Sequence, residues 1–223
     1  MKAHKTILAL DVENILQARN FLKKLYPQVK LYKVGPMLFT AYGPRIVELA
    51  RKKGAQVFLD LKFHDIPNTV AGAVRQAVRL KVAMLTLHTS GGKEMLQAAA
   101  HAAAIEAKKI KIKKPLLLGV TVLTSDKAGK NTRATVVTRA RLAQAAGLDG
   151  VVCSVHEAAA VRKACGRKFV IVTPGIRPAG ADTGDQKRVA TARGAFAAGA
   201  NYIVVGRPIL EAKNPLRALK EIL

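Results

Sequence analysis

Short apolar runs alternate with longer amphipathic segments along the whole 223-residue chain. Apolar runs rich in Val, Ile and Leu favour strands that are buried on both faces, as in a parallel sheet. The segments between them have the length and periodicity of helices, most clearly at 15–26, 69–81, 93–109, 139–147 and 208–223. The strand-like runs are TILALD (6–11), LYKVG (31–35), QVFLDLK (56–62), MLTLH (84–88), LLLGVTVL (116–123), GVVCS (150–154), FVIVTPG (169–175) and NYIVVG (201–206). The pattern therefore predicts eight βα units.

The spacing of these runs favours a closed barrel. From Asp11 to Gly206, seven intervals average about 28 residues, close to the roughly 31 residues per unit of a (β/α)8 barrel. The alternative, a doubly wound open sheet, would carry GxGxxG after the first strand, and that motif is missing from this position. The segments share no repeat consensus, and no Ser, Gly or Pro-rich linker divides them. We therefore expect residues 1–223 to form one single-domain (β/α)8 TIM barrel.

Composition narrows the class of protein. Half of the residues are apolar and 23% are charged, which excludes a disordered chain. No apolar run approaches the ~18 residues of a membrane span, so we expect no membrane association. The first apolar run is too short for a signal peptide, and we expect a cytoplasmic protein. Cys153 and Cys165 lack CxxC spacing and the five histidines lack HxH or HExxH spacing, so neither a disulfide framework nor a metal site is indicated.

The net charge of +24 is unusual, with 38 Lys and Arg against 14 Asp and Glu. Such an excess is typical of proteins that bind nucleic acid, which stays as an alternative function. The densest basic stretch, KKIKIKKP (108–115), lies between a helix and the fifth strand, at the end of a barrel opposite the active site. Aromatic residues are only 4% and Trp is absent, which is poor for base stacking. We expect weak, sequence-independent binding to polyanions and no specific nucleic acid partner.

Charged residues gather at the expected carboxyl ends of the strands, where barrels carry their active sites. Asp60 and Lys62 are two positions apart, so they share one face of a strand, while Leu59 and Leu61 take the other. Buried charges cost several kcal/mol each unless they are well paired, so a fold retains an array of them mainly for function. The candidate catalytic residues are Asp11, Lys33, Asp60, Lys62 and Asp65.

A candidate phosphate site follows the last two strands. The segment PGIRPAGADTGDQKR (174–188) follows strand seven, and Gly206–Arg207–Pro208 opens the last helix. The loops after strands seven and eight are where barrels commonly bind phosphate. Backbone N–H groups at a helix start and a forked guanidinium both suit such an anion.

These residues resemble the orotidine 5′-phosphate decarboxylase family. DLKFHDIPNT (60–69) matches the family signature DxKxxDxPxT, and shorter pieces follow in the family's order along the whole chain. Those pieces are ALD (9–11), KVG (33–35), TVLTS (121–125), PGIRP (174–178), DQKR (185–188) and VVGRPI (204–209). The resemblance implies decarboxylation of orotidine 5′-monophosphate to UMP in pyrimidine biosynthesis, without cofactor or metal.

The resemblance also implies roles for individual residues. Asp11 would bind the ribose, Lys33 would bridge the ribose and the charges, and Lys62 would be the general acid, in a network with Lys33, Asp60 and Asp65. Asp65 and Thr69 would act across the interface of a homodimer. Thr124 would meet the pyrimidine, and the phosphate would be bound by Arg177, Gln186, Gly206 and Arg207.

The chain departs from the family pattern at Pro36 and at Gly184, which replace a bulkier residue and an Asp; these departures concern loop stiffness and helix starts, not the catalytic array. Loss of CO₂ from the orotate ring leaves a carbanion without a carbonyl placed to absorb its charge. An ammonium fixed beside the carbanion can stabilise its charge and then protonate the carbon.

A metal-dependent sugar-phosphate decarboxylase of the same barrel type remains the nearest enzymatic alternative.

Overall fold

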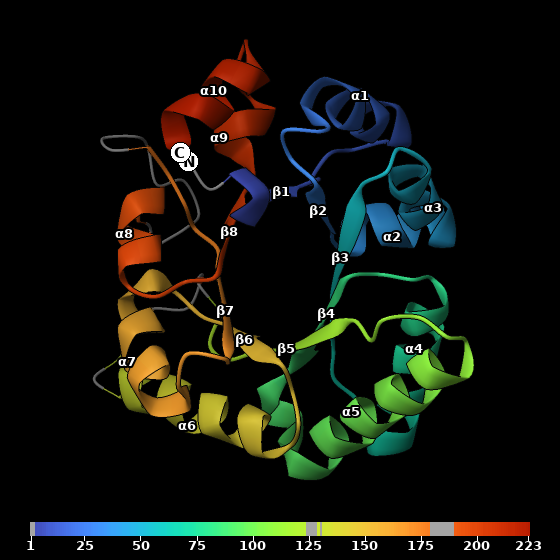
Figure 1. Ribbon diagram of the computed structural model, residues 1–223, viewed down its shortest axis with the longest axis vertical. Helices are drawn as coiled ribbons and strands as arrows, with labels where there is room; N and C mark the ends of the chain where they lie inside the picture. Colours follow the sequence, from blue (N-terminus) through green and yellow to red (C-terminus); the bar gives the residue numbers. More distant parts are fainter. Residues whose placement is uncertain (1–2, 124–128, 130, 179–189) are drawn as a thin grey trace.

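The computed structural model describes residues 3–123, 129, 131–178 and 190–223. Eight parallel strands close into a barrel in sequence order, each hydrogen-bonded to the next and β8 to β1, and helices surround them (Figure 1). The strands are β1 (Thr6–Ala9), β2 (Leu31–Val34), β3 (Gln56–Phe63), β4 (Met84–His88), β5 (Leu116–Val120), β6 (Gly150–Val152), β7 (Val170–Thr173) and β8 (Tyr202–Val205). The predicted TIM barrel is confirmed.

The helices form the outer layer. They are α1 (Ile15–Leu25), α2 (Pro36–Tyr42), α3 (Pro44–Lys52), α4 (Pro67–Arg79), α5 (Gly92–Lys109), α6 (Thr132–Ala145), α7 (Val155–Cys165), α8 (Ala192–Ala197), α9 (Arg207–Leu210) and α10 (Pro215–Ile222), with 3₁₀ turns η1 (Ala3–Lys5) and η2 (Thr89–Gly91). None of the described helices is long and apolar enough to cross a membrane.

Two apolar cores follow from the alternation of side chains along each strand. On β1, Ile7 and Ala9 belong to the cluster inside the barrel, with Phe58 and Val172 from other strands. Their neighbour Leu8 belongs to the larger cluster between the barrel and the helices. Because both faces of each strand are covered, the strands are continuous apolar runs, which is the pattern that the sequence displays.

The prediction of one last helix over 208–223 is wrong. The chain forms α9 and α10, and Asn214 lies between them as the N-cap of α10, its side chain accepting a hydrogen bond from the backbone of Arg217. Pro215 occupies the first position of α10, where its missing N–H costs nothing, and it disfavours helical backbone at Asn214. The break leaves only four residues in α9, directly after the predicted phosphate-binding Gly206.

Candidate active site

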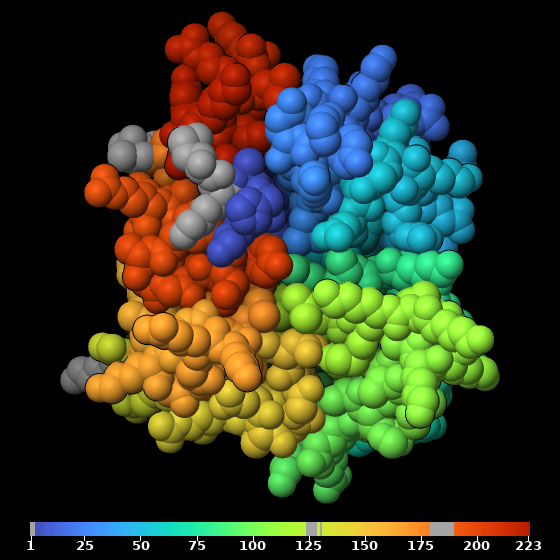
Figure 2. Space-filling model, viewed as in Figure 1, coloured from blue at the N-terminus to red at the C-terminus, as the bar shows by residue number. Residues whose placement is uncertain are grey.

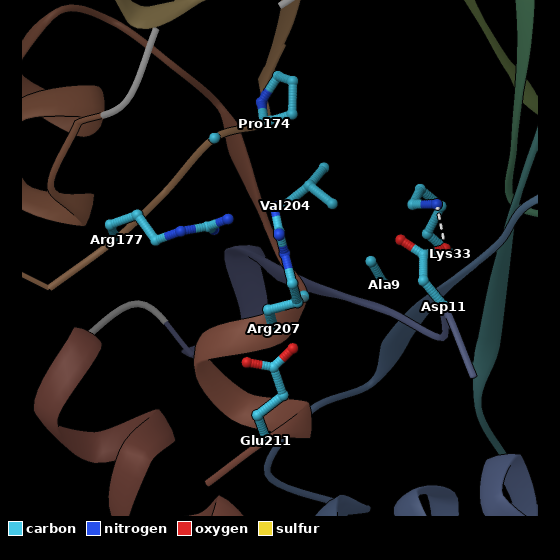
Figure 3. A pocket seen from close by; sticks show the side chains of 10 residues that line it. Ala9, Asp11, Lys33, Pro174, Arg177, Val204, Arg207 and Glu211 are labelled. Carbon is cyan, nitrogen blue, oxygen red and sulfur yellow. Dashed lines mark hydrogen bonds and ion pairs between the residues drawn. The ribbon is translucent and has the colours of Figure 1, made fainter. Parts of the chain in front are cut away.

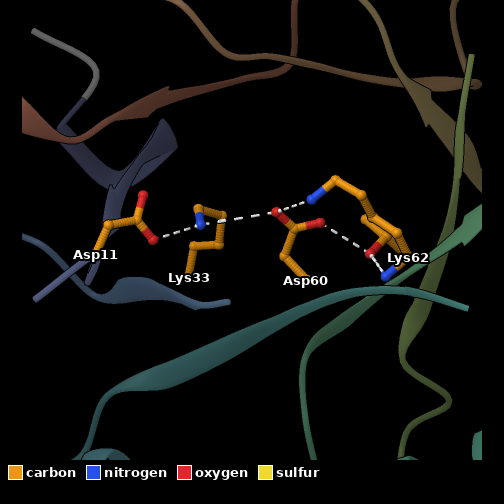
Figure 4. A network of polar contacts seen from close by, with 5 residues as sticks. Asp11, Lys33, Asp60 and Lys62 are labelled. Carbon is orange, nitrogen blue, oxygen red and sulfur yellow. Dashed lines mark hydrogen bonds and ion pairs between the residues drawn. The ribbon is translucent and has the colours of Figure 1, made fainter. Parts of the chain in front are cut away.

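Four charged residues of alternating sign form one chain of ion pairs at the mouth of the barrel (Figure 4). Asp11 follows β1, Lys33 lies on β2, and Asp60 and Lys62 lie on β3. The Lys33 ammonium is 2.9 Å from Asp11 Oδ1 and 3.7 Å from Asp60 Oδ2. The Lys62 ammonium is 2.9 Å from the same Asp60 oxygen. Asp60 therefore shares one oxygen between two cations.

Asp60 is the most enclosed carboxylate of this array, with 12% of its side chain exposed. Its second oxygen, Oδ1, accepts a hydrogen bond of 2.9 Å from the Thr86 hydroxyl. Removal of a carboxylate from water is costly, and here two ammonium groups and one hydroxyl compensate it. The arrangement holds a fixed negative charge between two fixed positive charges.

Thr86 was not singled out among the candidate residues. It lies on β4 and is completely buried; its hydroxyl donates to Asp60 and accepts a 2.9 Å hydrogen bond from the backbone N–H of Lys62. The pattern MLTLH (84–88) could have revealed it, because a lone hydroxyl on the inward face of an apolar strand needs a polar partner.

β3 bends where the array begins. Leu59 and Leu61 pack with the outer core, so the prediction that they face away from Asp60 and Lys62 is confirmed. Strict alternation does not continue, because Lys62 has φ 51° and the register with β4 shifts between Leu59 and Phe63. The left-handed conformation is uncommon for a lysine and is found mostly where surrounding contacts hold it in place. Here the hydrogen bond to Thr86 and the ion pair to Asp60 do so.

Asp65 and Thr69 lie outside the array within a single chain. Both are exposed, and the Asp65 carboxylate accepts a 2.6 Å hydrogen bond from the backbone of Ile66. None of the ion pairs between described residues joins Asp65 to Lys62. Ile66 itself is 67% exposed. Asp65 thus follows Asp60 and Lys62 closely in the sequence, but within one chain its carboxylate forms no ion pair with Lys62.

A cavity of about 490 Å³ opens beside the array (Figure 3). Arg177, from the segment after β7, and Arg207, from the start of α9, extend their guanidinium groups into the same part of it. Asp11 and Lys33 line its other side. The cavity thus joins two arginines to the charged array across a span suited to an elongated phosphorylated ligand. Its lining residues are Ala9, Asp11, Lys33, Pro174, Gly175, Arg177, Val204, Gly206, Arg207 and Glu211.

The backbone around this cavity explains two glycines. Gly175 has φ 75°, a conformation that favours glycine, and its carbonyl accepts a hydrogen bond from Ala190, which turns the chain after β7. A Cβ atom at Gly35 would lie 3.2 Å from the Lys33 ammonium and 3.4 Å from Asp11 Oδ1. Any larger residue at position 35 would therefore press on the Lys33–Asp11 pair.

A smaller cavity of about 130 Å³ lies over the other side of the array. It shares Lys33, Pro174 and Val204 with the first, so the two are adjacent parts of one mouth. Its walls are mostly apolar, and Asp60 and Lys62 are its charged members beside Lys33. A flat ring with one charged edge suits this part. The remaining lining residues are Phe58, Val120, Val122, Leu123, Val152 and Cys153.

Two predicted binding residues, Thr124 and Gln186, lie outside the described residues. Of the other predicted residues, the mouth brings together Asp11, Lys33, Asp60, Lys62, Arg177, Gly206 and Arg207.

His88 ends β4 near the array and is a second functional candidate that sequence reasoning passed over. Its ring lies 5.5 Å from that of His64. Partial burial lowers the pKa of His88, and the neighbouring His64 and Lys62 lower it further. The imidazole is therefore held neutral beside the Lys62 ammonium. Within the part of the chain that the structure describes, no three His, Cys, Asp or Glu side chains are grouped to hold a metal ion.

Comparison with known proteins agrees with this geometry. The model of the "Orotidine 5′-phosphate decarboxylase / HUMPS family" matches residues 4–222. Orotidine 5′-phosphate decarboxylase from Moorella thermoacetica is 49% identical over 227 residues, covering 98% of this chain and 90% of the relative. The Aliivibrio fischeri enzyme of the same name is 46% identical over 230 residues, covering 100% and 97%. The crystal structure of the Lactobacillus acidophilus enzyme superposes with a TM-score of 0.85 at 34% identity, covering 98% and 97%.

Proposed function

The chain belongs to the orotidine 5′-phosphate decarboxylase family and converts orotidine 5′-monophosphate to UMP in pyrimidine biosynthesis. We propose that fixed charges at the barrel mouth catalyse this reaction. The observation that carries this mechanism is the Asp11–Lys33–Asp60–Lys62 chain of ion pairs, which lines both adjacent cavities. The enzyme is a carboxy-lyase.

The substrate lies across the mouth with its phosphate at the arginine end. Arg177 and Arg207 bind the phosphate, with Gly206 providing close backbone approach and Gln186 a further hydrogen bond. Guanidinium side chains carry this site, because the four-residue α9 adds little helix dipole. Asp11 and Lys33 meet the ribose between the two ends. The pyrimidine enters the smaller apolar cavity, where Thr124 meets its edge.

Chemistry then occurs at Lys62. The carbon that loses CO₂ becomes a carbanion, and the ammonium of Lys62 stabilises the developing negative charge and donates its proton to that carbon. Asp60, 2.9 Å away, forms an ion pair with the Lys62 ammonium and fixes its position for this proton transfer. We propose that no cofactor takes part, because the preorganised ammonium supplies the stabilisation that an electron sink gives in other decarboxylases. Phosphate binding at the far end contributes energy that orders the site.

We further propose a homodimer in which Asp65 and Thr69 complete the partner's site. The support is their placement: both are exposed on one chain, beside the exposed Ile66, at the edge of the mouth that carries Lys62. Burial of Ile66 in an interface would remove a large apolar side chain from water. A carboxylate brought to Lys62 from the partner would give the ammonium a second anionic neighbour.

We propose that this biosynthetic enzyme is located in the cytoplasm.

The Cys165 thiol is buried, and burial raises its pKa, so we assign this thiol a structural role in the core.

The deciding experiment follows the ultraviolet absorbance of orotidine 5′-monophosphate with purified protein in the presence of EDTA. We expect full loss of the substrate absorbance, with formation of UMP and no added cofactor. Activity that EDTA removes and a divalent metal restores would instead favour the metal-dependent sugar-phosphate alternative. No turnover by a folded dimer would contradict the proposal.

A further inference from the structure

A second large cavity, of about 350 Å³, opens at the end of the barrel opposite the active site. Its walls include the first residues of four strands, Gln56, Met84, Leu116 and Tyr202. Figure 2 shows the end of the molecule where the chain starts; the segments at 51–56, 81–84 and 112–116, coloured cyan, green and yellow-green, meet near the middle of this face. The other lining residues are Arg51, Ala55, Lys81, Val82, Ala83, Ile112, Lys113, Lys114 and Pro115.

The cavity combines an apolar floor with a cationic rim. Lys114 is held by Asp149, 2.5 Å away. The other three cations are exposed, and none of the ion pairs between described residues includes Arg51, Lys81 or Lys113. Below them the floor is lined by aliphatic side chains and Tyr202. Small-molecule sites commonly combine apolar walls with charged groups that fix one end of the ligand.

The turns on this face show that two lysines occupy positions that suit glycine. Helix ends here pass through a left-handed residue, which is Gly54, Gly147, Gly166 or Gly199 at four turns. After α4 and α5 the left-handed residue is instead Lys81, with φ 56°, or Lys111, with φ 54°. A side chain makes this conformation unfavourable relative to glycine. Lys81 lines the cavity, and Lys111 immediately precedes lining residues 112–116.

Helix dipoles account for only part of this charge. Basic residues in the last turns of α3, α4 and α5 complement the negative helix ends that point to this face. Lys81 and Lys113 lie beyond the helices, in connecting segments that lead to β4 and β5. Their positions around the cavity therefore need another explanation.

We propose that this cavity is a second ligand site, which binds the phosphate chain of a nucleotide on Arg51, Lys81 and Lys113 and its ring on the apolar floor. Arg51 supplies a forked donor and the two lysines supply point charges, the groups that proteins use for phosphates. Tyr202 gives the floor an aromatic surface. The nucleotide is either free or the end of a nucleic acid strand, since both present the same chemistry.

Titration calorimetry tests the site, with ATP as one probe and a 15-nucleotide oligo(dT) as the other. The active site is filled with saturating UMP, so that neither probe binds there, and the buffer contains 150 mM KCl. Lys81→Gly removes one rim charge and relieves the left-handed backbone, so its melting temperature stays equal or rises. We expect this variant, and Arg51→Gln, to weaken probe binding by about tenfold or more, the size of a lost charge-assisted hydrogen bond.

Lys111→Gly is the matched control, because it loses the same charge and the same backbone strain but does not line the cavity. We expect its affinity to stay within about twofold of the wild-type value. Binding of ATP alone identifies a free nucleotide, and binding of the oligonucleotide identifies a strand. Failure of both probes to bind, or an equal loss in Lys111→Gly and Lys81→Gly, would overturn the proposal.

Discussion

The two ends of this barrel carry similar cations in opposite electrostatic settings. At the mouth, Lys33 lies between Asp11 and Asp60, and Lys62 pairs with Asp60. At the other end, Arg51, Lys81 and Lys113 line a cavity and take part in none of the ion pairs between described residues, whereas Lys114 of the same cavity pairs with Asp149. The chain has only 14 acidic residues, and three of them, Asp11, Asp60 and Glu211, line the two cavities of the mouth. The difference indicates that pairing, rather than charge alone, distinguishes the catalytic end.

Burial explains why pairing matters at one end. The side chains of Lys33 and Asp60 are each only 12% exposed, so their charges are fixed by one another and little screened by salt. The cations at the other end are exposed, so salt screens them and they act mainly on ligands that carry several charges. The paired charges at the mouth suit one substrate in a fixed orientation, whereas the cations outside ion pairs at the opposite end suit polyanions.

The largest effect is expected from Lys62→Ala, which removes the proposed proton donor at the mouth. We expect kcat to fall by about a thousandfold or more, because both charge stabilisation and proton transfer are lost. The measurement is the ultraviolet assay, with thermal melting alongside to show that the variant is folded. Retention of more than about a tenth of wild-type activity would refute the role of Lys62 as general acid.

Mixed dimers test whether the mouth is completed by the partner chain. Lys62→Ala and Asp65→Ala chains are each expected to be inactive alone. If Asp65 acts in the partner's site, exchange of subunits gives heterodimers with one intact site, and about a quarter of wild-type activity returns. Activity is measured after the two variants are mixed and equilibrated. Demonstrated subunit exchange without recovered activity would show that sites are not shared.

Arg207→Ala separates the arginine end of the mouth from the reacting end. The variant loses a charge-assisted contact to the phosphate. We expect kcat/KM to fall by about 10- to 150-fold, which corresponds to a loss of roughly 1.5–3 kcal/mol of transition-state stabilisation. The nucleoside without phosphate is the control substrate, and wild type and variant should turn it over alike. An equal loss on both substrates would assign Arg207 a role other than phosphate binding.

Thr86→Val tests how strongly the charged array depends on its hydrogen bonds to the Thr86 hydroxyl. Valine matches threonine in shape but leaves Asp60 Oδ1 and the N–H of Lys62 without their hydrogen bonds. We expect the free energy of unfolding to fall by about 1–3 kcal/mol and kcat to decrease, while Thr86→Ser, which keeps the hydroxyl, stays close to wild type. Denaturant unfolding and the ultraviolet assay measure the two effects. Equal behaviour of both variants would show that the hydroxyl does not support the array.

The smallest effect on catalysis is expected from the opposite end. Replacement of Lys108, Lys109, Lys111 and Lys113 by Gln should leave kcat/KM within about twofold, because these charges lie far from the mouth and are screened. Lys114 is kept, since Asp149 binds both its ammonium and the backbone N–H of Leu117. Binding to oligo(dT) should weaken and its salt dependence should become shallower. Loss of catalysis in the folded variant would place this stretch closer to the active site than the structure does.

The sequence alone determined the barrel and most of the mouth. Each strand is covered on both faces, so it appears as an apolar run, and eight such runs with helical segments between them leave few other folds. Asp11, Lys33, Asp60 and Lys62 could be found because parallel strands bring their carboxyl ends to one side, whatever the loops do.

Tertiary structure decided the features that depend on contacts between distant segments. The Thr86 hydroxyl on β4 binds Asp60 on the neighbouring strand β3, and the same hydroxyl holds the bend at Lys62. The local periodicity of the sequence therefore predicts neither feature. The cavity at the opposite end joins residues from 51 to 202 that share no motif. Local patterns fix which face of a strand a side chain occupies, but only the closed ring fixes which side chains meet across it.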